Sequence, residues 1–111
     1  MEITHKEKSG VLLIAIKGRL DGLNIPSADQ SINSLLEGGN NRLLFDFSQL
    51  EYLSSGGLRV ILSAAKEIKR RKGRIVLCEM QGYVKEIFEV SGFTSLIPIK
   101  DTVESGLAEL Q

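Results

Sequence analysis

Short apolar runs alternate along this chain with segments in which apolar residues recur at helical spacing. Three of the runs are apolar almost throughout, as is typical of strands buried on both faces of a sheet. They are Val11–Ile16, Leu43–Phe47 and Ile75–Cys78. Thr4–Lys8 is a weaker, polar strand candidate, and Leu96–Ile99 is a short one limited by Pro98. Because strands that alternate with helices pair in parallel through right-handed crossovers, this order predicts an α/β fold.

The segments between the runs predict helices. The first helix begins near Pro26 and ends at Gly38–Gly39, and the third covers Tyr83–Ser91. The second follows Ser48–Ser55, ends at Gly73 and carries the clearest apolar stripe of the chain. That stripe consists of Leu58, Ile61, Leu62, Ala65 and Ile68.

A last helix is expected after Asp101, which would cap it, with Glu104 at the spacing of a capping box. The first two strands can pair as an antiparallel hairpin across Ser9–Gly10. At 111 residues the chain has the size of one domain, because two cores would each be too small to be stable. The sequence therefore predicts a single domain, residues 1–111, with one mixed β-sheet of four to five strands packed with about four α-helices.

The composition argues against several classes of function. Lys plus Arg and Asp plus Glu number 14 each, and this balance argues against bulk electrostatic capture of nucleic acid or acidic lipid. One histidine, His5, and one cysteine, Cys78, cannot build a structural zinc site of the usual spacing. The chain also contains no GxSxG elbow, phosphate-binding loop or dinucleotide fingerprint. The sequence therefore predicts a protein that is not an enzyme and that holds no cofactor and no metal.

The same reading predicts a cytoplasmic protein. The longest apolar run, Val11–Ile16, is far shorter than the roughly 20 residues needed to cross a bilayer. The N-terminal segment is charged and lacks an apolar signal core, so we expect neither secretion nor membrane insertion. A single cysteine cannot form an internal disulfide, which suits a reducing compartment.

Three polar segments follow the ends of the expected parallel strands, where sites gather in sheets of this kind. They are Gly18–Asp21, Ser48–Gly57 and Glu79–Gly82. We expect Asp21, Asn24 and the Ser54–Gly57 segment to share one surface.

Ser54-Ser55-Gly56-Gly57 opens the most strongly amphipathic helix. Its first N–H groups are free to bind a phosphate carried by a serine, and the two glycines would let a partner approach the backbone closely. An ordinary N-cap serine, followed by glycines that allow the turn, explains the same residues. The spacing alone favours this simpler interpretation.

Other polar or reactive residues are expected to have structural roles. Asp46, at a strand end, should accept loop N–H bonds rather than take part in catalysis. The basic run Lys66 and Lys69–Lys72 should complement the helix dipole rather than bind nucleic acid. Cys78 should be a buried core thiol and His5 an exposed strand residue.

The segment DFSQLEYLSSGGLRVIL, Asp46–Leu62, resembles the signature of the STAS domain, named after sulfate transporters and anti-sigma factor antagonists. The pattern is an acidic residue after an apolar strand, then Ser, then an apolar-rich stretch that leads into [DS]-S-[STAG]-G-[LV]. Gly18–Asp21 is similar to the family's G-x-[LI]-D turn, and Val84–Phe93 with Leu96 to its third helix and exit. The resemblance covers nearly the whole chain and favours the small stand-alone bacterial antagonists.

This resemblance implies a STAS-like fold and a binding module rather than an enzyme. Such proteins dock on a cytoplasmic anti-sigma factor that is also a serine kinase of the histidine-kinase-like ATPase class, and docking frees the sigma factor. The kinase then phosphorylates the antagonist, the complex separates, and a PP2C-type serine phosphatase restores the unmodified form. We expect a monomer or weak dimer that does not bind nucleic acid.

The phosphorylated position of the family matches Ser55. Many antagonists have Asp just before it, where this chain has Ser54, so Ser54 is the alternative site. The resemblance also implies a set of partner-binding residues: Asp21, Asn24, Ser54, Ser55, Gly56, Gly57 and Arg59. Asp21 is equally well explained as the cap of its own turn.

Two other functions remain open at this stage. The chain could be a non-switched STAS scaffold or sensor subunit of a signalling assembly. It could also be a small-ligand, for example nucleotide, binding module, although no phosphate-loop fingerprint predicts one.

Overall fold

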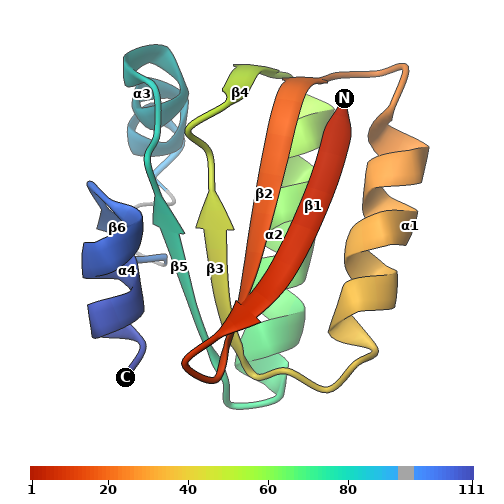
Figure 1. The fold of residues 1–111 in the computed structure, drawn as a ribbon. Helices are drawn as coiled ribbons and strands as arrows, with labels where there is room; N and C mark the ends of the chain where they lie inside the picture. Colours follow the sequence, from red (N-terminus) through yellow and green to blue (C-terminus); the bar gives the residue numbers. More distant parts are fainter. Residues whose placement is uncertain (93–96) are drawn as a thin grey trace.

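Six strands and four helices make up the part of the chain that the computed structural model describes, residues 1–92 and 97–111 (Figure 1). In chain order they are β1 (Glu2–Lys8), β2 (Val11–Leu20), α1 (Ile25–Leu36), β3 (Arg42–Asp46), β4 (Leu50–Leu53), α2 (Ser55–Arg70), β5 (Arg74–Cys78), α3 (Gly82–Val90), β6 (Ile99–Lys100) and α4 (Val103–Glu109). The α/β class predicted from the alternation of runs is confirmed.

The strands form one mixed sheet in the order β1-β2-β3-β5-β6. β1 and β2 pair antiparallel, as the expected hairpin, and β2, β3, β5 and β6 pair in parallel. β4 pairs with the last residues of β2, with Leu50 opposite Gly18 and Leu53 opposite Leu20. The parallel strands therefore all end at one edge of the sheet, where α1, α2 and α3 begin (Figure 1).

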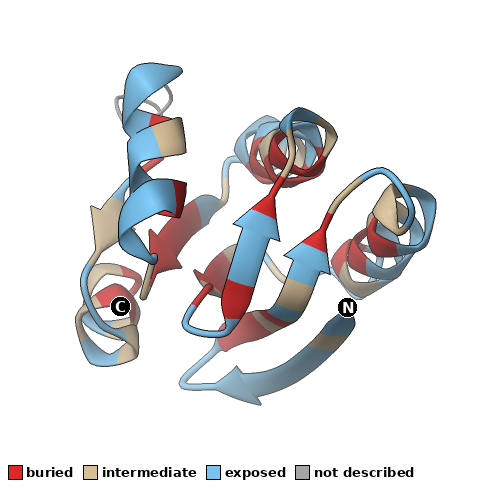
Figure 2. Cartoon of the chain, turned by 90° about the horizontal axis from the view of Figure 1, so that it is seen from above, coloured by how far each residue is buried: buried red, intermediate tan, exposed pale blue. Residues whose placement is uncertain are grey.

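The two faces of the sheet are covered unequally (Figure 2). The larger core lies between the sheet and helices α1, α2 and α3, and includes stacked rings of Phe45, Phe47 and Phe88. The smaller core lies on the opposite face, where Leu44 and Val76 pack against Leu107 and Leu110 at α4. Because α4 covers only part of its face, the ends of β1, β2 and β3 stay open there.

The buried face of α2 differs in detail from the expected stripe. Leu58, Ile61, Ala65 and Ile68 are buried as expected, but Leu62 is only partly buried. Val60 and Ala64 are buried instead. The reason is that α2 packs against α1 as well as the sheet, so its buried arc is turned toward α1 and leaves Leu62 at the margin.

β4 is the strand that the sequence analysis missed. The segment after Ser48 was expected to lead straight into α2, but it first extends alongside β2, which itself continues to Leu20 rather than ending at Ile16. The continuation is hard to see in the sequence because Lys17 and Arg19 are polar and exposed, and Gly18 has a φ of 94°.

The last helix begins one residue later than predicted. Its N-cap is Thr102, not Asp101, and the capping box joins Thr102 to Ser105 rather than involving Glu104. Thr102 Oγ1 accepts a hydrogen bond from Ser105 N at 3.0 Å, and Ser105 Oγ accepts one from Thr102 N at 3.2 Å. Both residue pairs have the right spacing, so the sequence alone does not distinguish them.

The last expected strand, Leu96–Ile99, is observed from its final residue as β6, Ile99–Lys100. Leu96, and the helix exit expected at Phe93, lie outside the described residues. None of the described helices combines the length and the apolar character that a membrane span requires.

Candidate functional site

The turn from β2 to α1 is held by the side chains of Asp21 and Asn24. Asp21 N donates to Asn24 Oδ1 at 2.9 Å, and Leu23 N donates to Asp21 Oδ1 at 3.2 Å. Asn24 Nδ2 donates in turn to Arg19 O at 2.6 Å. Asp21 therefore has the turn-capping role that the sequence allowed, while a contact of Asp21 with a partner stays a prediction.

The two adjacent serines at the start of α2 have different surroundings. Ser54 is the N-cap, with extended backbone angles, and its Oγ accepts a hydrogen bond from Gly57 N at 3.1 Å. Ser55 is the first residue of the helix and is exposed, and among the described residues its hydroxyl has no hydrogen-bond partner. The N-cap interpretation is thus right for Ser54, and Ser55 is left facing solvent.

Gly57 allows a close approach between elements inside the molecule. It is buried, and a Cβ at this position would lie 2.8 Å from Leu20 O and 2.8 Å from Leu53 Cδ1. At Gly56, which is partly buried, a Cβ would overlap Cδ1 of Ile25, the flexible end of a side chain. Gly57 therefore has a packing role inside the molecule, and a close approach of a partner to its backbone stays a prediction.

The expected convergence of the β2–α1 turn with Ser54–Gly57 is confirmed. Ser54 N donates to Leu20 O at 3.0 Å, immediately before the turn, and Ile25, immediately after the turn, reaches Gly56. Arg59, four residues after Ser55, is exposed on the same side of α2. Asp21, Asn24, Ser55 and Arg59 can therefore contribute to one surface, which we call the turn–helix surface together with Ser54, Gly56 and the rest of the turn.

Arg19 and Tyr52 extend this surface; they lie in the segments Gly18–Asp21 and Ser48–Gly57 expected at the strand ends, but neither residue was singled out, because the pairing of β2 with β4 that brings them together was not predicted. The Arg19 guanidinium carbon lies 4.3 Å from the centroid of the Tyr52 ring, a cation–π contact. Arg19 Nε also lies 3.5 Å from Asp21 Oδ2. Arg19 thus connects the turn to β4.

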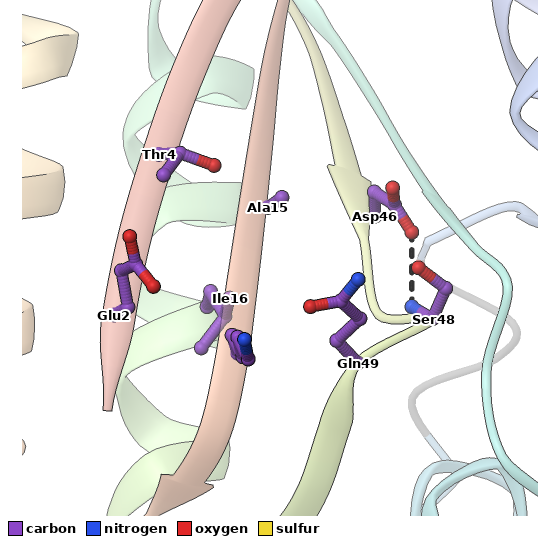
Figure 3. Close-up of a pocket in the computed structure, with 8 residues that line it drawn as sticks. Glu2, Thr4, Ala15, Ile16, Asp46, Ser48 and Gln49 are labelled. Carbon is purple, nitrogen blue, oxygen red and sulfur yellow. Dashed lines mark hydrogen bonds between the residues drawn. The ribbon is translucent and has the colours of Figure 1, made fainter.

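The third polar segment, Glu79–Gly82, belongs to a different group of residues. Gln81 Nε2 donates to Ser48 O at 3.0 Å, and Glu79 Oε2 accepts from Val103 N at the start of α4 at 3.0 Å. Asp46 Oδ1 accepts from Ser48 N at 2.9 Å, the loop-holding role expected of it (Figure 3).

A polar hollow of about 260 Å³ lies beside this second group, on the open face of the sheet. Thr4, Ala15 and Asp46 are in register on neighbouring strands and line it, with Gln49 pointing in from the following bend (Figure 3). Neither serine at the start of α2 lines this hollow.

Two groups have strongly shifted pKa values, and both lie away from the turn–helix surface. Burial raises the pKa of the Cys78 thiol to about 12, and Cys78 Sγ lies 3.4 Å from Phe45 O, so Cys78 is the core thiol expected from sequence. Hydrogen bonds from Arg70 and Arg71 lower the pKa of Glu67 to about 2. Arg71 also donates to Leu36 O at 2.7 Å, joining the C-terminal ends of α1 and α2.

Comparison with known proteins gives a consistent set of relatives. The family model described as "STAS domain" matches residues 2–106. A protein of Bordetella bronchiseptica, BtrV, named as a candidate anti-sigma factor antagonist, is 33% identical over 108 residues, which cover 97% of this chain and 93% of that protein.

Two solved structures agree with this match. An anti-sigma factor antagonist from Mycobacterium paratuberculosis superimposes with a TM-score of 0.90 at 18% identity, covering 98% of this chain and 92% of that one. The Bacillus cell fate determinant SpoIIAA, in its phosphorylated form, superimposes with a TM-score of 0.76 at 18% identity, covering 99% of this chain and 100% of that one. At these identities the likeness shows the fold.

Proposed function

The chain belongs to the STAS domain family, and on this premise we propose that it is an anti-sigma factor antagonist switched by phosphorylation of Ser55. In this proposal the unmodified protein binds a cognate anti-sigma factor through the turn–helix surface and so frees a sigma factor. The protein acts by binding and not by catalysis. The name of the Bordetella bronchiseptica relative, 33% identical along nearly the full chain, supports this assignment.

One observation carries the choice of Ser55 over Ser54. The Ser54 hydroxyl is used inside the chain, where it accepts a hydrogen bond from Gly57 N, whereas Ser55 is exposed. A kinase must reach the hydroxyl that it modifies, and a phosphate on Ser54 would replace the N-cap of α2. Ser55 is therefore the better acceptor. The solved phosphorylated form of SpoIIAA, a structural neighbour, supports a phosphorylation switch on this fold.

The proposed switch works through local charge. Phosphorylation adds about −1.5 to −2 charges and three strong acceptor oxygens. At the start of α2 these oxygens meet free N–H groups and the positive end of the helix dipole, so the fold is retained. A partner that packs against the unmodified hydroxyl would meet a hydrated dianion instead. A loss of about 4 kcal/mol of binding free energy weakens binding roughly a thousandfold.

The partners follow from this mechanism. The anti-sigma factor would be a serine kinase of the histidine-kinase-like ATPase class, and a PP2C-type serine phosphatase would remove the phosphate. Both would meet this chain in the cytoplasm, where it would act as a monomer or weak dimer.

The test begins with capture of the partner. Wild-type protein and the Ser55→Asp and Ser55→Ala variants are used to pull down proteins from the native cell, and the captured proteins are identified by mass spectrometry. We expect wild type and Ser55→Ala to retain an anti-sigma factor kinase and Ser55→Asp to lose most of it.

The purified kinase with ATP then locates the phosphate. Wild type and Ser54→Ala should be phosphorylated, and Ser55→Ala should not. Phosphate on Ser54 alone would overturn the site assignment. Phosphate on neither serine, with binding retained, would favour the non-switched scaffold, and tight nucleotide binding by the isolated chain would favour the small-ligand module.

A further inference from the structure

Leu23 is the most exposed large apolar residue among those the structure describes. Its exposed fraction is 96%, compared with 82% for Val90 and 44% or less for Met1, Tyr83 and Tyr52. Single exposed apolar residues are common on protein surfaces, so exposure alone assigns no role. The surroundings of Leu23 are what distinguish it.

The backbone that carries Leu23 is fixed by its neighbours. Leu23 N donates to Asp21 Oδ1, and Asp21 N donates to Asn24 Oδ1, while Asn24 N donates to Asp21 O at 3.0 Å. Polar side chains on both sides of Leu23 therefore hold the turn, and the leucine side chain points away from the protein. A residue presented by a rigid turn loses little backbone entropy when a partner covers it.

Leu23 also continues into the surface that carries Ser55. Ile25 is partly buried, and its Cδ1 reaches the position that a Cβ on Gly56 would occupy. Ile25 thus lies against the start of α2 at Gly56, one residue after Ser55, and Leu23 precedes Ile25 by two residues in the same turn. Val90 lies elsewhere, at the end of α3, whose N-cap residue Gln81 donates to Ser48 O rather than to the turn–helix surface.

We propose that Leu23 is an apolar anchor that inserts into an apolar pocket of the anti-sigma factor beside the point where that partner receives Ser55. This inference rests on the proposed function and names the residue that supplies affinity there. Ser55 decides whether the complex can form, because its modification changes charge, and Leu23 supplies apolar burial in the unmodified state. The binding site on the partner is therefore an apolar pocket, and beside it lies a surface that accommodates the serine hydroxyl but not a phosphate dianion.

The test compares Leu23→Ser with Val90→Ser, a matched change at the other highly exposed apolar position. Full burial of a leucine side chain corresponds to roughly a tenfold to hundredfold change in a dissociation constant. With the purified anti-sigma factor kinase, Leu23→Ser should therefore raise the Kd at least about tenfold, and Val90→Ser should leave it within about twofold. Leu23→Met should restore most of the affinity.

Kinetics separate docking from damage to the site. For phosphorylation of Ser55 by the same kinase, Leu23→Ser should raise the KM of the kinase for this protein and leave kcat close to wild type. Its melting temperature should also stay at the wild-type value, because the Leu23 side chain is almost fully exposed and its replacement removes almost no buried surface.

The possible outcomes distinguish this inference from the proposed function. If Leu23→Ser binds like wild type while Ser55→Asp does not, the anchor is wrong and the switch stands. If both serine substitutions at apolar positions weaken binding equally, affinity follows general surface hydrophobicity and the specific role of Leu23 is overturned. If the wild-type chain binds no anti-sigma factor, both proposals fail.

Discussion

Ser54 and Ser55 are adjacent and carry the same hydroxyl group, but only the hydroxyl of Ser54 caps the helix from within the chain. We predict that Ser54→Ala lowers the free energy of unfolding by about 1 kcal/mol, because the N-cap bond to Gly57 N is lost. Ser55→Ala should change it by less than about 0.5 kcal/mol, since Ser55 is exposed. Urea unfolding of the two variants measures both values, and equal losses would contradict the division of roles.

Gly57 and Gly56 give a second contrast between neighbours. An added Cβ at Gly57 meets the carbonyl oxygen of Leu20, which is backbone and cannot move aside, so we predict that Gly57→Ala destabilises the protein by about 1–3 kcal/mol. At Gly56 the obstacle is the end of the Ile25 side chain, and alanine is the better helix former. Gly56→Ala should therefore cost clearly less in the same unfolding measurement, and the reverse order would show that the packing at Gly57 is misjudged.

Residue-level predictions from sequence succeed where the chemistry is local. The burial of Cys78 follows from its apolar strand, and the bond from Ser48 N to Asp46 follows from the position of Asp46 at a strand end. The internal role of Gly57 could not be predicted, because the obstacle to a side chain belongs to Leu20, which is distant in sequence. The exposure of Leu23 could not be predicted either, because the sequence does not show in which direction an apolar side chain in a turn points.

At the scale of elements, the position of α2 between the sheet and α1 decides which of its residues matter for stability. We predict that Ile61→Ala lowers the free energy of unfolding by about 2–5 kcal/mol, because Ile61 is fully buried and its removal leaves a cavity. Leu62→Ala should cost less than half as much, since Leu62 is only partly buried. Chemical unfolding of both variants tests the orientation of the helix, and a larger loss for Leu62 would contradict it.

Glu67 forms ion pairs with Arg70 and Arg71 at the C-terminal end of α2, which predicts a pH dependence of stability. Arg70 and Arg71 hold the pKa of Glu67 at about 2, below the ordinary value of 4.5. The contribution of Glu67 is therefore fully present above about pH 4.5 and is lost as the pH falls toward 2.

The variant Glu67→Gln tests this contribution. Its stability deficit relative to wild type should be constant from pH 7 to pH 5 and should shrink as the pH is lowered further. Glu86→Gln, at an exposed position on α3, is the control and should show a pH profile parallel to wild type. A Glu67→Gln deficit that persists unchanged at pH 2.5 would rule out the ion pair as its cause.

Elements could be predicted wherever a single pattern of apolar residues continues along the whole element. The buried strands β3 and β5 and the amphipathic helix α2 are of this kind, and their positions in the sequence are close to those observed. β4 and the end of β2 were missed because their pairing depends on two segments that meet only in the folded sheet. At the start of α4, Val103 N donates to Glu79 Oε2, a contact with a residue distant in sequence that the spacing of Asp101 and Thr102 does not reveal.

At the scale of the whole molecule, the turn–helix surface lies beyond the ends of β2 and β4, and the smaller core lies between the sheet and α4. We predict that phosphorylation of Ser55 leaves the fold intact and alters backbone amide chemical shifts mainly in the β2–α1 turn and the first turns of α2. The amides of β5 and α4 should be nearly unchanged. Two-dimensional NMR spectra of the unmodified and phosphorylated protein measure this, and shifts spread through α4 would mean that the switch acts through a conformational change instead.

β1 forms one edge of the sheet, and its sequence, EITHKEK, places Glu, Lys and His side chains along an almost fully exposed strand. An open edge is a template on which a second copy can add its own strand, and charged side chains discourage that addition. Under the proposed function the protein would leave one complex before it enters another, and in between its β1 edge would be uncovered. The charges on β1 thus act against aggregation along this edge, although its first residues pair with the last part of β2, close to the β2–α1 turn that carries Leu23.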